Sequence, residues 1–276
     1  MDSIASNDGI HDIHYFATME NIKVVHNKAS RLFIFLAGFF IANALIAEFI
    51  GVKIFSLEKT LGFEPFSLVF FGQPLSFNLT CGVLLWPFVF ILTDVINEYY
   101  GRRGVRFLSF LAVGLITYAF AMIFLVIHVE PADFWITTKQ SQGISDMNNA
   151  FGVVFGQGLR IIAGSIVAFL VGQVVDVFVF HRIKKMTGEK KIWLRATGST
   201  VVSQLIDSYV VLFIAFYGQE GWTTALILGV GVVNYIYKFT MAVLLTPLIY
   251  ILHGIIDNYI GDDLAKELKD YALKTS

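Results

Sequence analysis

The sequence predicts an all-α integral membrane protein, a bundle of six transmembrane helices with both termini in the cytoplasm. Composition gives the first evidence: 56% of the 276 residues are hydrophobic, only 15% are charged, and the mean hydropathy is +0.70. Soluble domains are nearer to about 45–50% apolar and about 25% charged. A chain of this length has too little interior to hide so many apolar side chains from water. These values exclude a cytosolic enzyme, a nucleic-acid-binding protein and a disulfide-stabilised secreted domain.

Six apolar runs supply the second observation. About twenty apolar residues cross a hydrocarbon core of roughly 30 Å, and we expect spans at 32–50, 79–99, 107–128, 156–180, 199–217 and 223–253. Residues 1–31 and 254–276 are then cytoplasmic tails. The first tail lacks the basic start, apolar stretch and cleavage site of a secretory signal, so we expect the first span to be retained.

The fourth and sixth runs are longer than one span requires. The fourth is apolar from Phe151 onward, and Gly156 and Gly158 flank Gln157 near its start. The sixth would be about 46 Å long as a helix, and Pro247 interrupts it. Tilt or a break must absorb this excess. We keep the sixth run as one span, because splitting it would move the C-terminus across the membrane.

Lys and Arg are distributed unevenly between the two sides of these spans, which is the third observation. Fifteen of the twenty lie in the tails and in the loops after spans 2 and 4: Lys23, Lys28, Arg31, Arg102, Arg103, Arg106, Arg182, Lys184, Lys185, Lys190, Lys191, Arg195, Lys266, Lys269 and Lys274. Only Lys53, Lys59 and Lys139 lie on the other side. Because short cytoplasmic loops are enriched in Lys and Arg, both termini are expected in the cytoplasm.

Two segments outside the spans have weaker patterns. Residues 51–78 mix six Phe residues with charges, and 53–57 alternate weakly, as a strand would. This outer segment is expected either to cap the outer mouth of the bundle or to rest on lipid headgroups. Residues 261–274 are typical of a short, solvated amphipathic helix.

Ionisable residues inside the spans are the candidate functional groups. A charge at the bilayer centre costs about 2.5–3.5 kcal/mol on insertion scales, so such groups face partners, water or a ligand. The seven are Glu48, Asp94, Glu98, Arg160, Asp176, Asp207 and Lys238. At 1.5 Å per residue, Asp94 and Asp176 lie about 8 and 6 Å from their cytoplasmic ends, and Asp207 lies about 12 Å deep.

Helical spacing places further polar groups beside these charges. The shared faces are Asp94 with Asn97 and Glu98, Gln173 with Asp176, Gln204 with Asp207, and Asn234 with Lys238. Spans 4 and 5 run in opposite directions, so both Gln-x-x-Asp pairs can point into one cavity in the cytoplasmic half.

Structural interpretations of the same residues remain open. Asp94 and Glu98 could reach the interface and pair with Arg102 or Arg103. Asp176 could pair with Arg182 or Lys184, and Glu48 could join Arg160 at the outer rim. Asp207 and Lys238 could neutralise each other, which is compatible with lining a cavity.

The sequence carries no motif for catalysis, metal or nucleotide. His128, His181 and His253 lie at span ends without metal-ligand spacing, and Cys81 is the one cysteine. A Walker A loop and a G-x-S-x-G elbow are absent from the sequence. We therefore expect no enzyme activity, no cofactor and no metal site.

The segment 93–101, T-D-V-I-N-E-Y-Y-G, closes span 2 and closely resembles the signature of the queuosine precursor transporter family, part of the vitamin uptake transporter group. Further similar segments follow in order: Arg160, G-Q-V-V-D-V-F-V-F at 172–180, W-L-R at 193–195, S-T-V-V-S-Q-L-I-D at 199–207 and I-A-F-Y-G at 214–218. The resemblance covers roughly 32–253. It implies a multi-pass protein of the bacterial cytoplasmic (inner) membrane that imports a queuosine precursor, usually 7-cyano-7-deazaguanine or its aminomethyl form, for salvage into transfer RNA.

The resemblance and the polar residues together give a candidate binding site for this 7-deazaguanine. Its expected residues are Asp94, Asn97, Glu98, Gln173, Asp176, Gln204, Asp207, Asn234 and Lys238. A carboxylate can accept from N1–H and the N2 amine of a guanine-like edge together, and we assign this role to Asp207 with Gln204 beside it. Asp94, Asn97 and Glu98 would form the opposite wall, and Gln173 with Asp176 the inner gate.

Lys238 would keep the charge of this site near neutral, and an aromatic side chain could stack on the ligand ring. The candidates for stacking are Trp86, Phe178, Tyr209 and Tyr235. Transport would expose the site alternately to each side. Besides the substrate and the lipid bilayer we expect no nucleic-acid partner, and a homodimer is left open.

Two other functions remain alternatives. The substrate-binding subunit of an energy-coupling-factor vitamin importer would need an ATPase module as partner. Such subunits commonly use an Ala-x-x-x-Ala face in the first span, whereas Ala37, Ala42 and Ala47 are spaced by five. A membrane enzyme that acts on lipid or peptide is the third and weakest reading.

Overall fold

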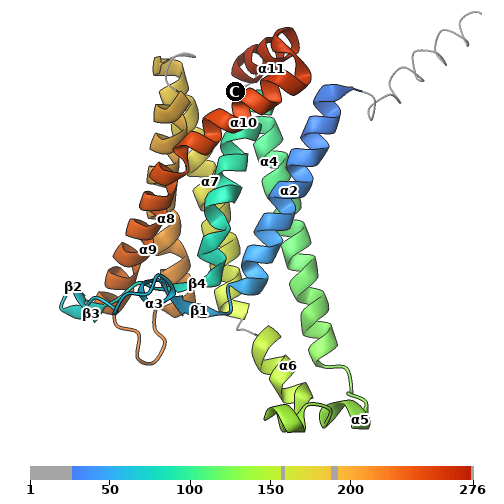
Figure 1. The fold of residues 1–276 in the computed structure, drawn as a ribbon, viewed down its shortest axis with the longest axis vertical. Helices are drawn as coiled ribbons and strands as arrows, with labels where there is room; N and C mark the ends of the chain where they lie inside the picture. Colours follow the sequence, from blue (N-terminus) through green and yellow to red (C-terminus); the bar gives the residue numbers. More distant parts are fainter. Residues whose placement is uncertain (1–26, 157–158, 188–191, 275–276) are drawn as a thin grey trace, which may run out of the picture.

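The structure is a computed structural model that describes residues 27–156, 159–187 and 192–274 (Figure 1). Its elements, in chain order, are α2 (Lys28–Ile50), β1 (Ile54–Ser56), α3 (Leu57–Thr60), β2 (Leu68–Phe70), β3 (Gln73–Leu75), β4 (Asn78–Thr80), the 3-10 helix η2 (Cys81–Leu84), α4 (Trp86–Ile127), α5 (Asp133–Ile136), the 3-10 helix η3 (Gln140–Gln142), α6 (Met147–Phe155), α7 (Leu159–Thr187), α8 (Ile192–Phe216), α9 (Thr224–Leu244), α10 (Thr246–Ile260) and α11 (Asp262–Lys274).

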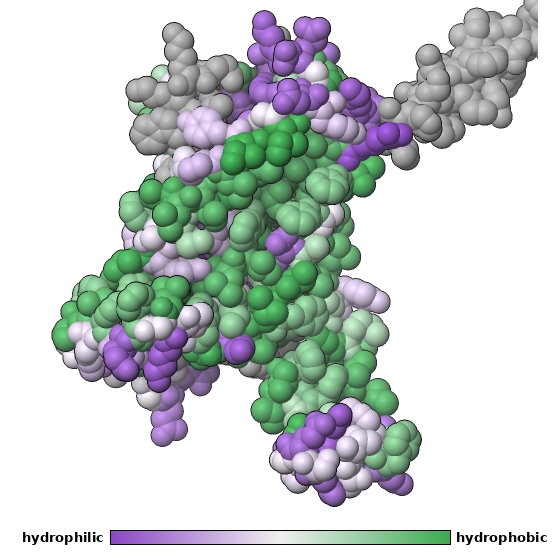
Figure 2. Space-filling model, viewed as in Figure 1, coloured by the Kyte–Doolittle hydropathy of each residue, from purple (hydrophilic) through white to green (hydrophobic). Residues whose placement is uncertain are grey.

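The chain is a mostly helical membrane protein. Four helical segments in the described residues are long and apolar enough to cross a bilayer: Lys28–Ile50, Trp86–Ile127, Ile162–Thr187 and Thr224–Ile260. A shorter apolar helix covers Val201–Phe216. Figure 2 shows apolar side chains over the middle of the molecule, with hydrophilic ones gathered towards its two ends. The predicted helical membrane class is confirmed, while the count of six spans and the side of the termini stay predictions.

Helix α4 contains most of two predicted spans, because the chain reverses inside it at Gly101 (Figure 1). Gly101 has φ 67° and ψ −173°, which glycine adopts without a steric penalty from Cβ. The first arm begins later than the predicted span 79–99, since Leu79 lies in β4 and residues 81–84 form η2. Pro87 stands in the first turn of α4, where its missing N–H costs no helical hydrogen bond.

The sixth apolar run is broken, not one helix. Helix α9 ends at Leu244 and α10 begins at Thr246, with Pro247 in the first turn of α10. The two helices continue in the same general direction in Figure 1, and the kink absorbs the excess length. Helix α10 then runs to Ile260, so the expected tail at 254–276 is largely helical.

Helices α7 and α8 pack closely because small residues face α8. A Cβ on Gly164 would lie 3.2 Å from the carbonyl oxygen of Val211, and one on Gly172 would lie 3.5 Å from Cβ of Asp207. Ala168, between them on the same face, is 1% exposed. Small residues let membrane helices approach closely. This contact brings the polar residues of the two helices together.

The outer segment between α2 and α4 folds as two antiparallel hairpins, β1–β4 and β2–β3. Leu75 packs so closely on α9 that a Cβ on Gly229 would lie 2.6 Å from it. Glu58 is buried and accepts a hydrogen bond from the Phe77 backbone N–H at 2.7 Å. The segment is therefore packed on the bundle, although Phe63 and Phe71 remain exposed.

Candidate functional site

The deepest charges predicted in the membrane form an ion pair. Nζ of Lys238 on α9 donates to Oδ2 of Asp207 on α8, and their side chains are 7% and 16% exposed. Gly172 of α7 leaves room beside Asp207. The neutralisation of Asp207 by Lys238, one of the interpretations left open by the sequence, is what the structure shows.

Asp176 lies between α7 and α8 and is completely buried. Its Oδ1 accepts a hydrogen bond from the Ser203 hydroxyl at 3.1 Å. Arg182 and Lys184 were the partners that the sequence left open for Asp176, and this partner is neither of them. The hydroxyl contact ties Asp176 to α8, the helix that carries Asp207.

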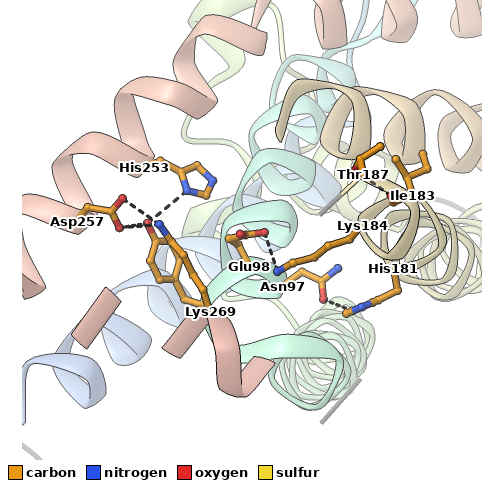
Figure 3. A network of polar contacts seen from close by, with 10 residues as sticks. Asn97, Glu98, His181, Ile183, Lys184, Thr187, His253, Asp257 and Lys269 are labelled. Atoms are coloured by element: carbon orange, nitrogen blue, oxygen red, sulfur yellow. Dashed lines mark hydrogen bonds and ion pairs between the residues drawn. The ribbon is translucent and has the colours of Figure 1, made fainter. Parts of the chain in front are cut away.

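Helices α4 and α7 are joined by three polar contacts along one face. Gln173 Nε2 donates to the Thr93 hydroxyl at 3.1 Å, and His181 Nε2 lies 2.9 Å from Asn97 Oδ1. Since Oδ1 only accepts, Nε2 is the protonated nitrogen of His181. Lys184 Nζ donates to Glu98 Oε2 at 3.2 Å, and the side chains of this ion pair are 1% and 2% exposed (Figure 3). Glu98 is therefore buried inside the bundle and paired with a Lys of α7.

The next residue of α4 joins two further helices. The Tyr99 hydroxyl donates to Asp257 Oδ1 on α10 at 2.6 Å and lies 3.3 Å from His253 Nδ1. Lys269 of α11 contacts both Asp257 oxygens, at 2.9 and 3.0 Å, and lies 5.0 Å from the centre of the Tyr99 ring. We call Tyr99, His253, Asp257 and Lys269 the Tyr99 cluster; the last three of these residues are labelled in Figure 3.

Several buried polar atoms of the candidate site have no hydrogen-bond partner among the residues that the structure describes. They are Asn97 Nδ2, Gln173 Oε1, Asp176 Oδ2, Gln204 Oε1 and Ser208 Oγ. An unsatisfied buried polar group costs about 1–3 kcal/mol. Three of the five are oxygens that can only accept, so the site is prepared for a ligand that donates hydrogen bonds.

The structure thus brings most predicted site residues onto the facing surfaces of α4, α7, α8 and α9. Asp94 and Gln204 are both 3% exposed. Asn234 is half-buried one turn before Lys238, and no hydrogen bond joins its side chain to another described residue. Glu48 of α2 accepts a hydrogen bond from Ser165 of α7; the side chain of Arg160 lies outside the described part of the chain.

The aromatic candidates for stacking have different surroundings. Trp86 packs on Phe169 with ring centres 5.4 Å apart, and the Tyr209 ring packs on Gly231. Tyr235 lies beside Phe239, with ring centres 6.3 Å apart. Phe178 is 62% exposed on the outer face of α7, so its assignment as a stacking residue is wrong.

Sequence reasoning missed His181, Lys184 and Ser203. Lys184 was counted with the cytoplasmic loop, because the predicted span ended at 180, whereas α7 continues to Thr187. The signal was available: Lys184 lies eleven residues after Gln173, three helical turns along the same face. Within the described residues no group of three His, Cys, Asp or Glu could hold a metal ion.

The helices are apolar and long enough to cross a membrane. They enclose buried ion pairs and acceptors that have no partner among the described residues. These features define a polytopic membrane protein with an internal polar site. The sequence profile of the putative vitamin uptake transporter family matches residues 80–252. The chain belongs to this family, and it is a membrane transport protein.

Three relatives share this similarity. A protein of Bacillus subtilis (strain 168), described as a probable queuosine precursor transporter, is 32% identical over 65% of this chain and 73% of its own length. A probable queuosine precursor transporter of Haemophilus influenzae is 27% identical over 62% and 66%. The queuosine precursor transporter of Escherichia coli (strain K12) is 26% identical over 73% and 83%. No solved structure matches the chain.

Proposed function

We propose that the chain imports a 7-deazaguanine precursor of queuosine across the bacterial cytoplasmic membrane, by alternating access around the polar site between α4, α7, α8 and α9. The names of three relatives support the substrate class. The observation that carries the proposal is the set of buried acceptors without partners, Gln173 Oε1, Asp176 Oδ2 and Gln204 Oε1.

A guanine-like edge matches these acceptors. It offers N1–H and the N2 amine as donors and O6 as an acceptor. Nδ2 of Asn97 has no partner among the described residues and could donate to O6. A ligand that completes these hydrogen bonds removes the cost of leaving them unmade, which is about 1–3 kcal/mol for each group.

Charge pairing makes the site suitable for an uncharged planar ligand. Lys238 balances Asp207, and Lys184 balances Glu98. A neutral cyano-substituted ring can bind beside these pairs without adding a further buried charge. We assign Asp207 as the carboxylate that accepts from the ring edge, with Lys238 holding it in position.

The energy-coupling-factor subunit remains the alternative. Ala42 is exposed and Ala47 is buried in α2, so these two alanines lie on different faces of the helix. Co-purification of the expressed chain with ATPase subunits would favour this alternative.

The test is uptake of labelled 7-cyano-7-deazaguanine into proteoliposomes that contain the purified chain. We expect saturable uptake that unlabelled 7-cyano-7-deazaguanine competes away, and a weaker effect of guanosine, whose ribose blocks a planar slot. Runs with and without a proton gradient separate coupled transport from facilitated diffusion. Liposomes that take up no more label than empty ones would contradict the proposal.

A further inference from the structure

Helix α11 closes the end of the bundle at which α4 turns, and a single residue joins it to α10 (Figure 1). This residue, Gly261, has φ +91°, and a Cβ added there would meet nothing within 4 Å. The joint therefore combines glycine's backbone freedom with free space around it. Hinges in moving domains are commonly a few residues at the ends of elements.

The apolar contact between α11 and the bundle is made in part by alanine. Ala265 and Ala272 are buried, and the Ala272 carbonyl oxygen lies 3.2 Å from the position of a Cβ on Gly101. Leu264 and Leu268 are only partly buried. Alanine buries little apolar surface compared with Leu or Phe, so this contact stabilises α11 less than a span is stabilised by its neighbours.

The polar contact that holds α11 in position is the Tyr99 cluster. Lys269 is the member that α11 contributes, and it bonds to Asp257 while lying over the Tyr99 ring. The side chains of Lys269 and Asp257 are 18% and 30% exposed. Partly solvated ion pairs separate at small cost, because water replaces the lost contact.

Behind this cluster lie residues that the closed bundle shields completely. Asn97, Glu98 and Lys184 are 0–1% exposed, so water does not reach these side chains in this conformation. Asn97 and Glu98 stand within about two helical turns of the end of the first arm of α4. At that end α11 lies against Gly101 and over the Tyr99 ring.

We propose that α11 is a second gate, at the end of the bundle beyond the Gln173 and Asp176 gate expected from the sequence, latched across α4 by Lys269, Asp257 and Tyr99 and swinging about Gly261 to release substrate. This inference rests on the proposed import function. Tyr99 is the positioning residue of the gate: it follows Asn97 and Glu98 directly in α4, so a shift of that segment also moves the ring on which Lys269 rests.

A reversible tether tests the gate. In a Cys81→Ser background, Asp257→Cys and Lys269→Cys are joined by a bis-methanethiosulfonate reagent in proteoliposomes. We expect uptake of labelled 7-cyano-7-deazaguanine to fall at least about tenfold, because the tether lowers the population of the open conformation by at least that factor. Uptake should recover after reduction. Uptake through the tethered protein at the untethered rate would overturn the gate.

A second measurement does not depend on transport. Asn97→Cys in the Cys81→Ser background is labelled with a membrane-impermeant maleimide supplied at the α11 side, alone and combined with Lys269→Ala. Loss of a partly solvated ion pair shifts the closed equilibrium by about twofold to fivefold, so we expect labelling to be faster by that factor. Lys266→Ala, which removes an exposed Lys one turn earlier in α11, is the matched control.

Equal labelling rates in the Lys269→Ala and Lys266→Ala variants would overturn the gate whatever the substrate is. If the Cys81→Ser protein neither binds nor carries the deazaguanine, the proposed function fails, and the labelling experiment still decides the role of α11. If it carries the compound and the tether has no effect, the gate alone fails.

Discussion

Asp207 and Lys238 combine burial, charge and a position between helices. Desolvating two charges is costly, and removing one partner of a buried pair commonly costs about 3–5 kcal/mol because the other charge is left uncompensated. A substitution that removes one of these charges therefore lowers stability as well as changing binding. Only a variant in which both residues are changed separates the effect on stability from the effect on binding.

Asp207→Asn is expected to abolish import and to lower stability, since an acceptor oxygen becomes a donor against N1–H and Lys238 loses its counterion. The double variant Asp207→Asn with Lys238→Gln removes both charges, so it should regain most of the stability without regaining uptake. Thermal unfolding in detergent and restoration of queuosine in transfer RNA from external precursor measure the two effects. Normal restoration in the single variant would show that Asp207 is not the clamp.

Glu98→Gln distinguishes an interior residue from an interfacial one. With Lys184 1% exposed as its partner, we expect the variant to lose about 3–5 kcal/mol of stability. Glu130→Gln, an exposed acid beyond the end of α4, should change stability by less than about 0.5 kcal/mol. Unfolding curves that coincide for the two variants would contradict the assignment of Glu98 to a buried, stabilising ion pair.

At the scale of single elements, the turn inside α4 depends on a glycine for two reasons. Gly101 has φ 67° and also lies against Ala272. Gly218 has φ 76° with nothing within 4 Å of an added Cβ. Any other residue would strain the backbone at both positions, but only at Gly101 would its side chain also meet a neighbouring helix.

Gly101→Ala is therefore expected to destabilise the protein by about 1–3 kcal/mol more than Gly218→Ala does, because overpacking adds to the strain. The measurement is the midpoint of thermal unfolding for both variants. Equal shifts of the unfolding midpoint would mean that α11 moves to accommodate a methyl group at residue 101 without a measurable loss of stability.

The outer segment gives a pH-dependent prediction. Burial alone would raise the pKa of Glu58, but hydrogen bonds from the Phe77 N–H and the Ser56 hydroxyl outweigh it and hold that pKa below its ordinary 4.5. The ionised form is thus favoured on folding. This stabilisation is present above the ordinary pKa and is lost as the pH falls through the lowered one.

Glu58→Gln is expected to remove this dependence. Proteolysis of the segment between α2 and α4 should accelerate below about pH 4.5 in the native chain, and in the variant it should be fast already at neutral pH. Glu64→Gln, which replaces an exposed acid of the same segment, is the control. A native digestion rate that is flat with pH would contradict the assigned role of Glu58.

At the scale of the whole molecule, the start of α2, the turn of α4, the end of α7 and α11 lie at one end (Figure 1). Most of the Lys and Arg among the described residues belong to these segments. The predicted orientation puts this end in the cytoplasm. Alkaline phosphatase fused after Lys274 should be inactive, and fused after Leu61 it should be active, because the enzyme matures only outside the cytoplasm. An active phosphatase fused after Lys274 would show that the orientation is the opposite of the predicted one.

The helices were predictable because apolar runs of membrane length have few other uses, and the break near Pro247 was visible in the sequence. The start of α4 was not, since Leu79 is as apolar in β4 as in a span. For the candidate site, the sequence predicted which polar residues share a face of the same helix. The pairing of Glu98 with Lys184 was not, because it depends on how far α7 extends and on which helix packs beside it.

The position of three consecutive residues, Asn97, Glu98 and Tyr99, has a thermodynamic consequence. They contact α7, α10 and the Lys269 that α11 provides, so we expect ligand binding at the proposed site and the docking of α11 to be energetically linked. Linkage is reciprocal. An antibody fragment that binds α11 should then change the affinity for the proposed ligand by the same factor by which that ligand changes the affinity for the antibody.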